Sequence, residues 1–400
     1  MATPTAAPYR ARQHYDGISR MIAPSSAPTL RGSVSSTLAG DALRHVSSLE
    51  LEHLREEWRG LVLHSPSPHL LDLPEWILPA IRASNIRSSF SAIVSRHADM
   101  LIGVLPIVQR PTFLGAIPTR VTRGFMSELS PRCDLIHHHA YAKLATQLSW
   151  EALREDQRWR VLELPNVPQG GAADTLAEYA KNEGFRVETI PTLSTPIINL
   201  TQGSLTYLPA EARVYRACLE TKLRKVRQLG DIRLRSYTST EQPLHLLIAL
   251  EKNARRRGGS QGLHTTPESV GIYREIGLWA ERCGALRVFS LEINGEPLSL
   301  LYGITVQDTY YALRVAHDTR LAMYSPGQLV VMAALQELQS QGTRACELVG
   351  PALPWKMVWT SATRKHHSHY IFRPDHRGRT PLASLLTLVV RGRSAWQHLL

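Results

Sequence analysis

Residues 309–342 read TYYALRVAHDTRLAMYSPGQLVVMAALQELQSQG, and this passage carries the strongest indication of the fold. Its first part is apolar and aromatic and predicts a β-strand, after which Pro326 and Gly327 begin a helix with an apolar face. The first turn of such a helix has unpaired backbone N–H groups and the positive end of the helix dipole, so phosphate oxygens can bind there. Gly327 permits close approach of the backbone. By spacing alone, the pattern also fits an ordinary turn between a strand and a helix.

Two similar passages, residues 89–110 and 285–307, each read as an apolar strand, a polar turn and a second apolar strand. The second turn is Asn294-Gly295, a strong hairpin signal because both central residues need positive φ. After each hairpin we expect a further strand, a helix and a strand, with helix 141–154 and strand 160–164 in the first half and helix 328–341 and strand 344–349 in the second. The matching order predicts a structural duplication, although any α/β chain can show such similarities in the order of its strands and helices.

The chain is long enough for two packed domains, with 400 residues of which 43% are apolar. We expect a disordered leader over 1–40, an N-terminal domain over 41–200, a C-terminal domain over 201–380 and a final helix over 381–400. The N-terminal domain should open with an amphipathic helix that runs from Asp41 past Trp58. Further elements are expected as helix 208–230, strand 232–237 and helices 243–257 and 267–284.

Composition limits the possible functions. The formal charge of +12 should attract polyanions, whether nucleotide phosphates, tRNA or an anionic surface. No run approaches the roughly 20 apolar residues of a membrane span, and the N-terminus does not resemble a signal peptide, so we expect a cytoplasmic protein with no integral membrane segment. The four cysteines are widely spaced and do not suggest disulfides or a zinc knuckle. Motifs typical of NTPases, dinucleotide oxidoreductases, serine hydrolases and zincins are absent from the sequence.

A series of short motifs in the second half resembles the CelD/FemAB-like branch of the GNAT acyltransferases. In chain order they are Asn294-Gly295-Glu296-Pro297, His317-Asp318, Tyr324-Ser325-Pro326-Gly327, Gly342, Glu347, Gly350 and Trp355-Lys356. The match covers about residues 215–375, and weaker features at Trp58 and 74–76 extend it into the first half. The resemblance implies an α/β fold (α+β mixed sheets) with two tandem GNAT-like domains. It also implies an acyl-CoA cosubstrate, such as acetyl-CoA, and, more loosely, a role in envelope or polysaccharide synthesis.

The donor and the acid–base groups can be assigned on this basis. The resemblance implies that residues Tyr324, Ser325, Pro326, Gly327 and Gln328 hold the acyl-CoA. Acyl transfer needs a base for the attacking group, donors for the oxyanion and an acid for the leaving thiolate. Glu347 is the candidate base, because partial burial on an apolar strand would raise its pKa. The alternative is a buried structural carboxylate paired with Arg344 or Arg314. The family often has Asp at this position.

Other residues near the motifs are also candidates. Asp318 and His317 end the preceding strand and are alternatives for the base, although turn residues often serve only as caps. Tyr324 is expected to protonate the sulfur, or else to pack at the base of the loop. Lys356, with Trp355 and Arg314, is a candidate for substrate binding, and a surface lysine is the alternative.

Two further clusters have simpler explanations. The basic residues of 222–227 and 255–257 are typical of solvated faces, and the alternative is binding of the CoA 3′-phosphate, a phosphorylated acceptor or tRNA. Cys133 with His137, His138 and His139 resembles a metal set, but consecutive residues of an extended segment point in alternating directions. We therefore interpret it as a polar loop and predict no metal.

These inferences favour direct transfer of an acyl group, such as acetyl, from acyl-CoA to an amine or hydroxyl of a small molecule or glycan. An alternative is a FemAB-type aminoacyltransferase that uses aminoacyl-tRNA. Another is a non-catalytic module with the GNAT fold.

Overall fold

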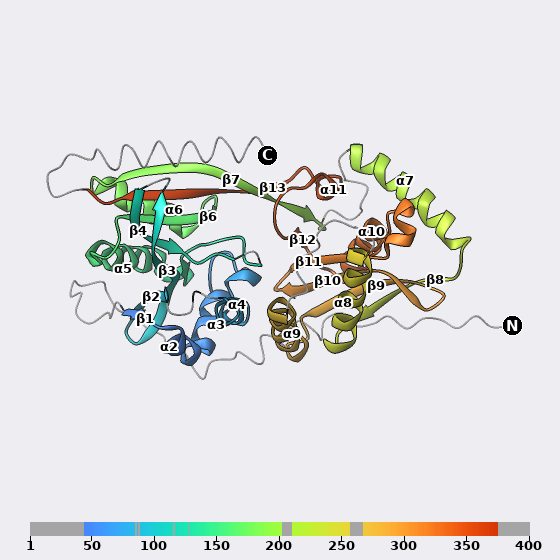
Figure 1. The fold of residues 1–400 in the computed structure, drawn as a ribbon, viewed down its shortest axis with the longest axis horizontal. Helices are drawn as coiled ribbons and strands as arrows, with labels where there is room; N and C mark the ends of the chain where they lie inside the picture. Colours follow the sequence, from blue (N-terminus) through green and yellow to red (C-terminus); the bar gives the residue numbers. More distant parts are fainter. Residues whose placement is uncertain are drawn as a thin grey trace. The chain divides into compact units, whose positions relative to one another are not determined.

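The computed structural model describes residues 44–374 apart from 85, 87–88, 115–116, 128, 202–209 and 257–266. These residues form two compact units (Figure 1). The N-terminal unit contains the described residues up to 196 together with 350–353 and those from 362 onward. The C-terminal unit contains residues 197–349 and 354–361. The predicted leader over 1–40 and the predicted final helix over 381–400 lie outside the described residues.

The N-terminal unit is built on a mixed sheet in the order β1-β2-β3-β4-β6-β13-β7. Neighbouring strands are antiparallel except β4 and β6, which are parallel. Its strands are β1 (Arg44–Val46), β2 (Phe90–His97), β3 (Met100–Leu114), β4 (Ile117–Gly124), β5 (Ile136–His137, beside β3), β6 (Val161–Pro168), β7 (Arg186–Asn199) and β13 (Thr363–Phe372). Its helices are α2 (Ser48–His53), α3 (Arg55–Leu63), α4 (Pro74–Arg82), α5 (Ala142–Glu155) and α6 (Ala172–Asn182).

The C-terminal unit has a second mixed sheet, in the order β12-β11-β10-β9-β8, and the end of β7 lies beside β12. Among the described strands of this sheet, β11 and β12 are the only parallel neighbours. Its strands are β8 (Ile232–Tyr237), β9 (Leu286–Ile293), β10 (Glu296–Val306), β11 (Thr309–His317) and β12 (Ala345–Leu348). Its helices are α7 (Ala210–Arg227), α8 (Glu241–Arg256), α9 (Pro267–Arg282), α10 (Pro326–Ser340) and α11 (Pro354–Met357).

The two units repeat one order of elements, which confirms the predicted duplication. A strand, helices, three antiparallel strands, a helix and a parallel strand follow one another as β1 to β6 in the first unit and as β8 to β12 in the second. Both predicted hairpins are present, as β2-β3 and β9-β10. At the second turn Asn294 and Gly295 have φ of 52° and 84°, as a turn with two left-handed residues requires.

The start of the N-terminal unit differs from the predicted single helix. Residues 44–46 form β1, with Val46 opposite Ala92 of β2. Helix α2 begins only after Ser47, whose Oγ accepts the Glu50 N–H while the Glu50 carboxylate accepts the Ser47 N–H at 2.7 Å. This capping box separates strand from helix. The prediction is wrong here because the pairing with β2 overrides the helical period of the apolar residues.

Strand β13 occupies an unexpected place. It comes from the last described part of the chain, which we had assigned to the domain over 201–380, yet it lies between β6 and β7 in the N-terminal unit. In turn, residues Ile197–Asn199 at the end of β7 pair with β12 of the C-terminal unit. The physical reason is that backbone groups at an open strand edge require partners, and a neighbouring segment supplies them whatever its place in the sequence.

Each unit has its own hydrophobic core. In the C-terminal unit, Leu329, Val330 and Leu335 of α10 pack against Phe289 and Tyr310 of the sheet. Because α10 is apolar around most of its circumference, it is buried deeply. In the N-terminal unit the core contains two fully buried tryptophans and a residue of β13; these are Trp150, Trp159 and Ile371. Among the described residues, no helix combines the length and apolar character of a membrane span.

Candidate active site

The two parallel strands β11 and β12 separate soon after they begin. They pair from Thr309 opposite Ala345 to Ala312 opposite Leu348. Strand β12 then ends, whereas β11 continues to His317. The described part of β11 beyond Ala312 therefore has no pairing with β12.

A β-bulge in β11 accounts for the separation. In the pairing with β10, Ala312 lies opposite Gly303 and Arg314 lies opposite Tyr302, so Leu313 is the extra residue. Gly303 leaves space for a buried ring, because a Cβ there would lie 2.2 Å from Cζ of Tyr310. A bulge bends its strand and turns the following side chains to the other face. The sequence motif gave no indication of this change.

The bulge decides which way the predicted residues of β11 face. Before it, Tyr310 and Ala312 belong to the core with α10; after it, Val315 packs against that core. Val315 and His317 contact the start of α10, since a Cβ on Gly327 would lie 3.2 Å from Val315 Cγ1 and 3.3 Å from His317 Nδ1. Burial lowers the pKa of His317, and the neighbouring Asp318 only partly offsets this effect. At neutral pH His317 is therefore a neutral base.

The loop between β11 and α10 has a defined conformation. A short 3₁₀ helix, Thr319–Tyr324, leads to Ser325, which has a left-handed backbone with φ 55° and ψ 53°. Helix α10 then begins at Pro326. Lys222 Nζ donates to Ser325 Oγ at 2.7 Å, and Trp359 Nε1 donates to Gln328 Oε1 at 2.7 Å. The five residues predicted to hold the donor thus lie together around the N-terminus of α10, with a lysine beside them.

Glu347 and Lys356 form the second part of the site, at the end of β12. They are only 3% and 6% exposed. Lys356 Nζ donates to the backbone oxygens of Leu348 at 3.3 Å and Val349 at 2.7 Å, directly beyond Glu347. Burial lowers the pKa of Lys356 to about 8, although the negative charge of Glu347 acts to raise it. This ammonium group is therefore close to the point of losing its proton at physiological pH.

The arginines that might have paired with Glu347 have other carboxylate partners. Arg344 lies 3.4 Å from Asp308, and Arg314 forms a mostly buried ion pair with Glu251 of α8. Cys346 and Leu348 belong to the core with α10, so Glu347 faces the opposite side of the sheet by strand alternation. Lys356 interacts with Glu347 through its charge, and a lysine can deprotonate at neutral to alkaline pH, whereas an arginine cannot.

The other predicted site residues differ in their contacts and in their exposure. Asp318 accepts the Arg320 N–H at 2.9 Å and its Nε–H at 2.7 Å, so it caps the turn, as the alternative interpretation has it. Tyr324 packs against the core beside the donor loop, and Trp355 is 36% exposed with its ring 5.4 Å from Lys356 Nζ. Sequence reasoning gave no role to Trp359, and only an aromatic residue soon after the Trp-Lys pair could have indicated one.

The basic residues of 222–227 and 255–257, predicted to form solvated faces, are described only in part. In α7, Lys222 is half-buried against Ser325, while Arg224, Lys225 and Arg227 are exposed. The basic group at 255–257 lies partly outside the described residues.

The ring of His138 stacks on those of His139 and His64 at centroid distances of 4.5 and 5.7 Å, so these imidazoles are layered and do not converge on one point. Cys133 is buried in the core of the N-terminal unit.

Residues 213–357 match the acetyltransferase (GNAT) domain family, so this part of the chain belongs to the GNAT superfamily, as the motifs predicted. No curated protein matches the chain.

Solved structures extend the likeness of fold to both units. FemX has a TM-score of 0.52 at 14% identity, with 82% of this chain and 96% of FemX covered. The C-terminal domain of an Agrobacterium fabrum protein described as a lysylphosphatidylglycerol synthetase has a TM-score of 0.50 at 11% identity, with 86% and 96% covered. At these identities the likeness concerns the fold alone, and it agrees with the predicted α/β architecture of two GNAT-like units.

Proposed function

We propose that the chain transfers an acyl group, such as acetyl, from acyl-CoA to an amine or hydroxyl acceptor where β11 and β12 separate. The observation that carries this proposal is the end of the β11–β12 pairing at Ala312, with the start of α10 in contact with Val315 and His317 of β11. The part of β11 that does not pair with β12 suits the extended amide-containing arm of CoA. The N-terminus of α10, with Lys222 beside it, suits the pyrophosphate.

The reaction needs no covalent enzyme intermediate. The acceptor nitrogen or oxygen attacks the thioester carbonyl, a C–N or C–O bond forms, and the C–S bond breaks as the tetrahedral intermediate collapses. In our proposal Glu347 takes the proton of the acceptor, with His317 as the alternative base. Backbone N–H groups of β11 beyond the bulge stabilise the oxyanion. Tyr324, next to the donor loop, protonates the departing thiolate.

Lys356 is proposed to act beside Glu347. Because it caps the end of β12 and its pKa is about 8, it can hold an anionic acceptor group or stabilise the ionised Glu347 without a permanent charge. Trp355, partly exposed next to it, is suited to contact the same acceptor. A CoA donor also agrees with the cytoplasmic location predicted from the sequence.

The alternative that a specific observation favours is aminoacyl transfer from aminoacyl-tRNA. The exposed Arg224, Lys225 and Arg227 on α7 would attract a polynucleotide, since phosphate contacts supply most non-specific affinity. The third possibility is a non-catalytic module with this fold, which would bind neither acyl-CoA nor aminoacyl-tRNA.

Thermal stability with three ligands separates these readings. A ligand that binds the folded state raises the melting temperature by mass action. Acetyl-CoA and free CoA should raise it, whereas bulk tRNA at the same ionic strength should not. Release of CoA thiol from acetyl-CoA in the presence of amino sugars, polyamines and amino acids then tests turnover. Stabilisation by tRNA alone would replace the proposal by the aminoacyl-tRNA reading, and stabilisation by no ligand would leave only the non-catalytic one.

A further inference from the structure

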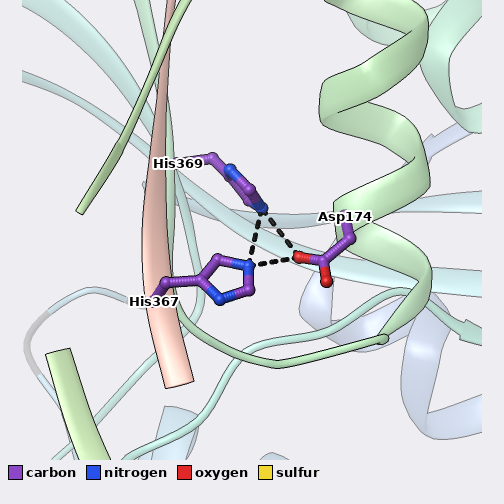
Figure 2. A group of neighbouring side chains, drawn as sticks. All are labelled: Asp174, His367 and His369. Atoms are coloured by element: carbon purple, nitrogen blue, oxygen red, sulfur yellow. Dashed lines mark hydrogen bonds and ion pairs between the residues drawn. The ribbon is translucent and has the colours of Figure 1, made fainter. Parts of the chain in front are cut away.

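Three side chains of the N-terminal unit converge on one point (Figure 2). They are Asp174 from α6 and His367 and His369 from β13. His369 Nε2 lies 2.8 Å from Asp174 Oδ1 and 3.1 Å from His367 Nε2, and His367 Nε2 also contacts Asp174 Oδ1. Nothing in the proposed acyl transfer uses this group, so the inference below does not depend on that function.

The strand geometry brings the two imidazoles together. His367 and His369 are two residues apart on β13, a spacing that places side chains on one face of a strand. Thr189 lies directly opposite His369 on β7, and its Oγ1 is 2.9 Å from His369 Nδ1. With the proton on Nδ1, His369 presents the lone pair of Nε2 toward Asp174. A hydrogen bond to the far ring nitrogen is the usual orienting contact of a metal-bound histidine.

The carboxylate is held in place independently. Asp174 lies in the first turn of α6, and its Oδ2 accepts the Gly170 N–H at 2.8 Å. This contact leaves Oδ1 to face the imidazoles.

Three potential ligand atoms, one from each side chain, lie close enough together to hold a small divalent cation. Two imidazole nitrogens at 3.1 Å would place lone pairs against one another unless a proton lies between them. Tetrahedral zinc, with bonds of about 2.0–2.2 Å, separates its ligand atoms by roughly 3.3 Å. This is close to the 3.1 Å between the two Nε2 atoms, whereas the contacts of Asp174 Oδ1, such as 2.8 Å to His369 Nε2, would lengthen when an ion binds. The side chains of His367, His369 and Asp174 are 16%, 7% and 24% exposed, so the point between them is enclosed but can be reached.

We propose that Asp174 Oδ1, His367 Nε2 and His369 Nε2 bind one divalent transition-metal ion, with a water or another small ligand completing the coordination. Two imidazoles and one carboxylate suit zinc, and zinc is the ion for which the tetrahedral spacing fits. The site would join β13, a strand from the end of the described chain, to α6 of the N-terminal unit. Metal binding should therefore stabilise the attachment of β13 to its sheet.

The test uses the full chain without a histidine tag, stripped with EDTA and dialysed. Calorimetric titration with ZnCl₂ should give about one ion per chain and a higher melting temperature. Co²⁺ should give the intense visible absorption of a four-coordinate ion with nitrogen ligands, and zinc should abolish it. His369→Gln and Asp174→Asn should each weaken zinc binding by at least about 10-fold. The control is His53→Gln, which removes an exposed imidazole of the same unit and should change nothing.

A variant of Thr189, the residue that orients His369, provides a second test if the His369→Gln and Asp174→Asn proteins do not fold. Thr189→Val keeps the β-branched shape and removes only the contact to His369 Nδ1, so zinc affinity should fall about 10–100-fold in a folded protein. The proposal is overturned if the stripped wild type takes up no zinc at micromolar concentration. It is equally overturned if His369→Gln, correctly folded, binds as the wild type does; a metal-free His–Asp–His hydrogen-bonded cluster would then remain.

Discussion

Replacing Glu347 by glutamine separates a catalytic carboxylate from a structural one, because the change keeps the shape of the side chain and removes its charge. If Glu347 is the general base, turnover should fall by roughly 10²–10⁴-fold. Affinity for CoA should hardly change, since the proposed donor contacts lie in residues 324–328 and not at the end of β12. The side chain is 3% exposed, so a change in its charge is felt by its neighbours.

The cost in stability is limited by Lys356. Loss of one partner from a buried ion pair usually costs about 3–5 kcal/mol, because the other charge is trapped. Lys356 has a pKa of about 8, so at pH 7 it escapes this penalty by releasing its proton at a cost of about 1.4 kcal/mol, one pKa unit. The loss caused by an unpartnered lysine in Glu347→Gln should therefore be at most about 1.4 kcal/mol at pH 7.

The lowered pKa of Lys356 also determines how the stability of the protein changes with pH. The folded pKa of Lys356 lies below its ordinary value of 10.5, so between about pH 8 and 10.5 the unfolded chain binds more protons and this group adds stability as the pH rises. Without Glu347 the folded pKa drops further, so the lysine is neutral at a lower pH. The difference in stability between wild type and Glu347→Gln should therefore be smaller at pH 8.5 than at pH 7.

Two measurements on the same protein test this reasoning. Single-turnover release of CoA thiol from acetyl-CoA, with the best amine of the acceptor panel, gives the chemical step, and urea unfolding at pH 7 and pH 8.5 gives the stability. Glu296→Gln, the same change at an exposed residue of the same unit, is the control and should leave both unchanged. A folded Glu347→Gln protein with normal turnover would refute the role as base and move it to His317. A destabilisation that is equal at both pH values would refute the interaction with Lys356.

Three further predictions concern the donor site and the leader. Gly327→Val should weaken CoA binding measured by calorimetry, because the side chain would press on Val315 and His317, while Gly271→Val, where a Cβ meets open space, should not. Lys222→Met should weaken CoA binding most at low salt, since it removes the charge that contacts Ser325. An equal loss of affinity relative to the wild type at 20 mM and 200 mM NaCl would contradict this. Deletion of residues 1–40 should leave melting temperature and turnover unchanged, because their sequence has no sustained apolar period that would add to a core.

The sequence by itself determined the local elements and their order. Asn294-Gly295 required a tight hairpin, Pro326-Gly327 marked a helix start, and the apolar periods on either side placed α10 and the strands around it. These features depend on neighbours within a few residues, so they can be read from a short window. Their order along the chain was sufficient for the duplication and for the resemblance to GNAT acyltransferases.

Only the tertiary structure decided which distant segments meet. The bulge at Leu313 turns Arg314 toward Glu251, and the fold of the chain after β12 places Lys356 beside Glu347. In the same way β13 enters the N-terminal sheet and brings His367 to Asp174. Such contacts depend on which backbone edges are open and which charges remain unpaired once the sheets have formed. No local pattern of residues records this information, because the partners come from parts of the chain that the pattern does not include.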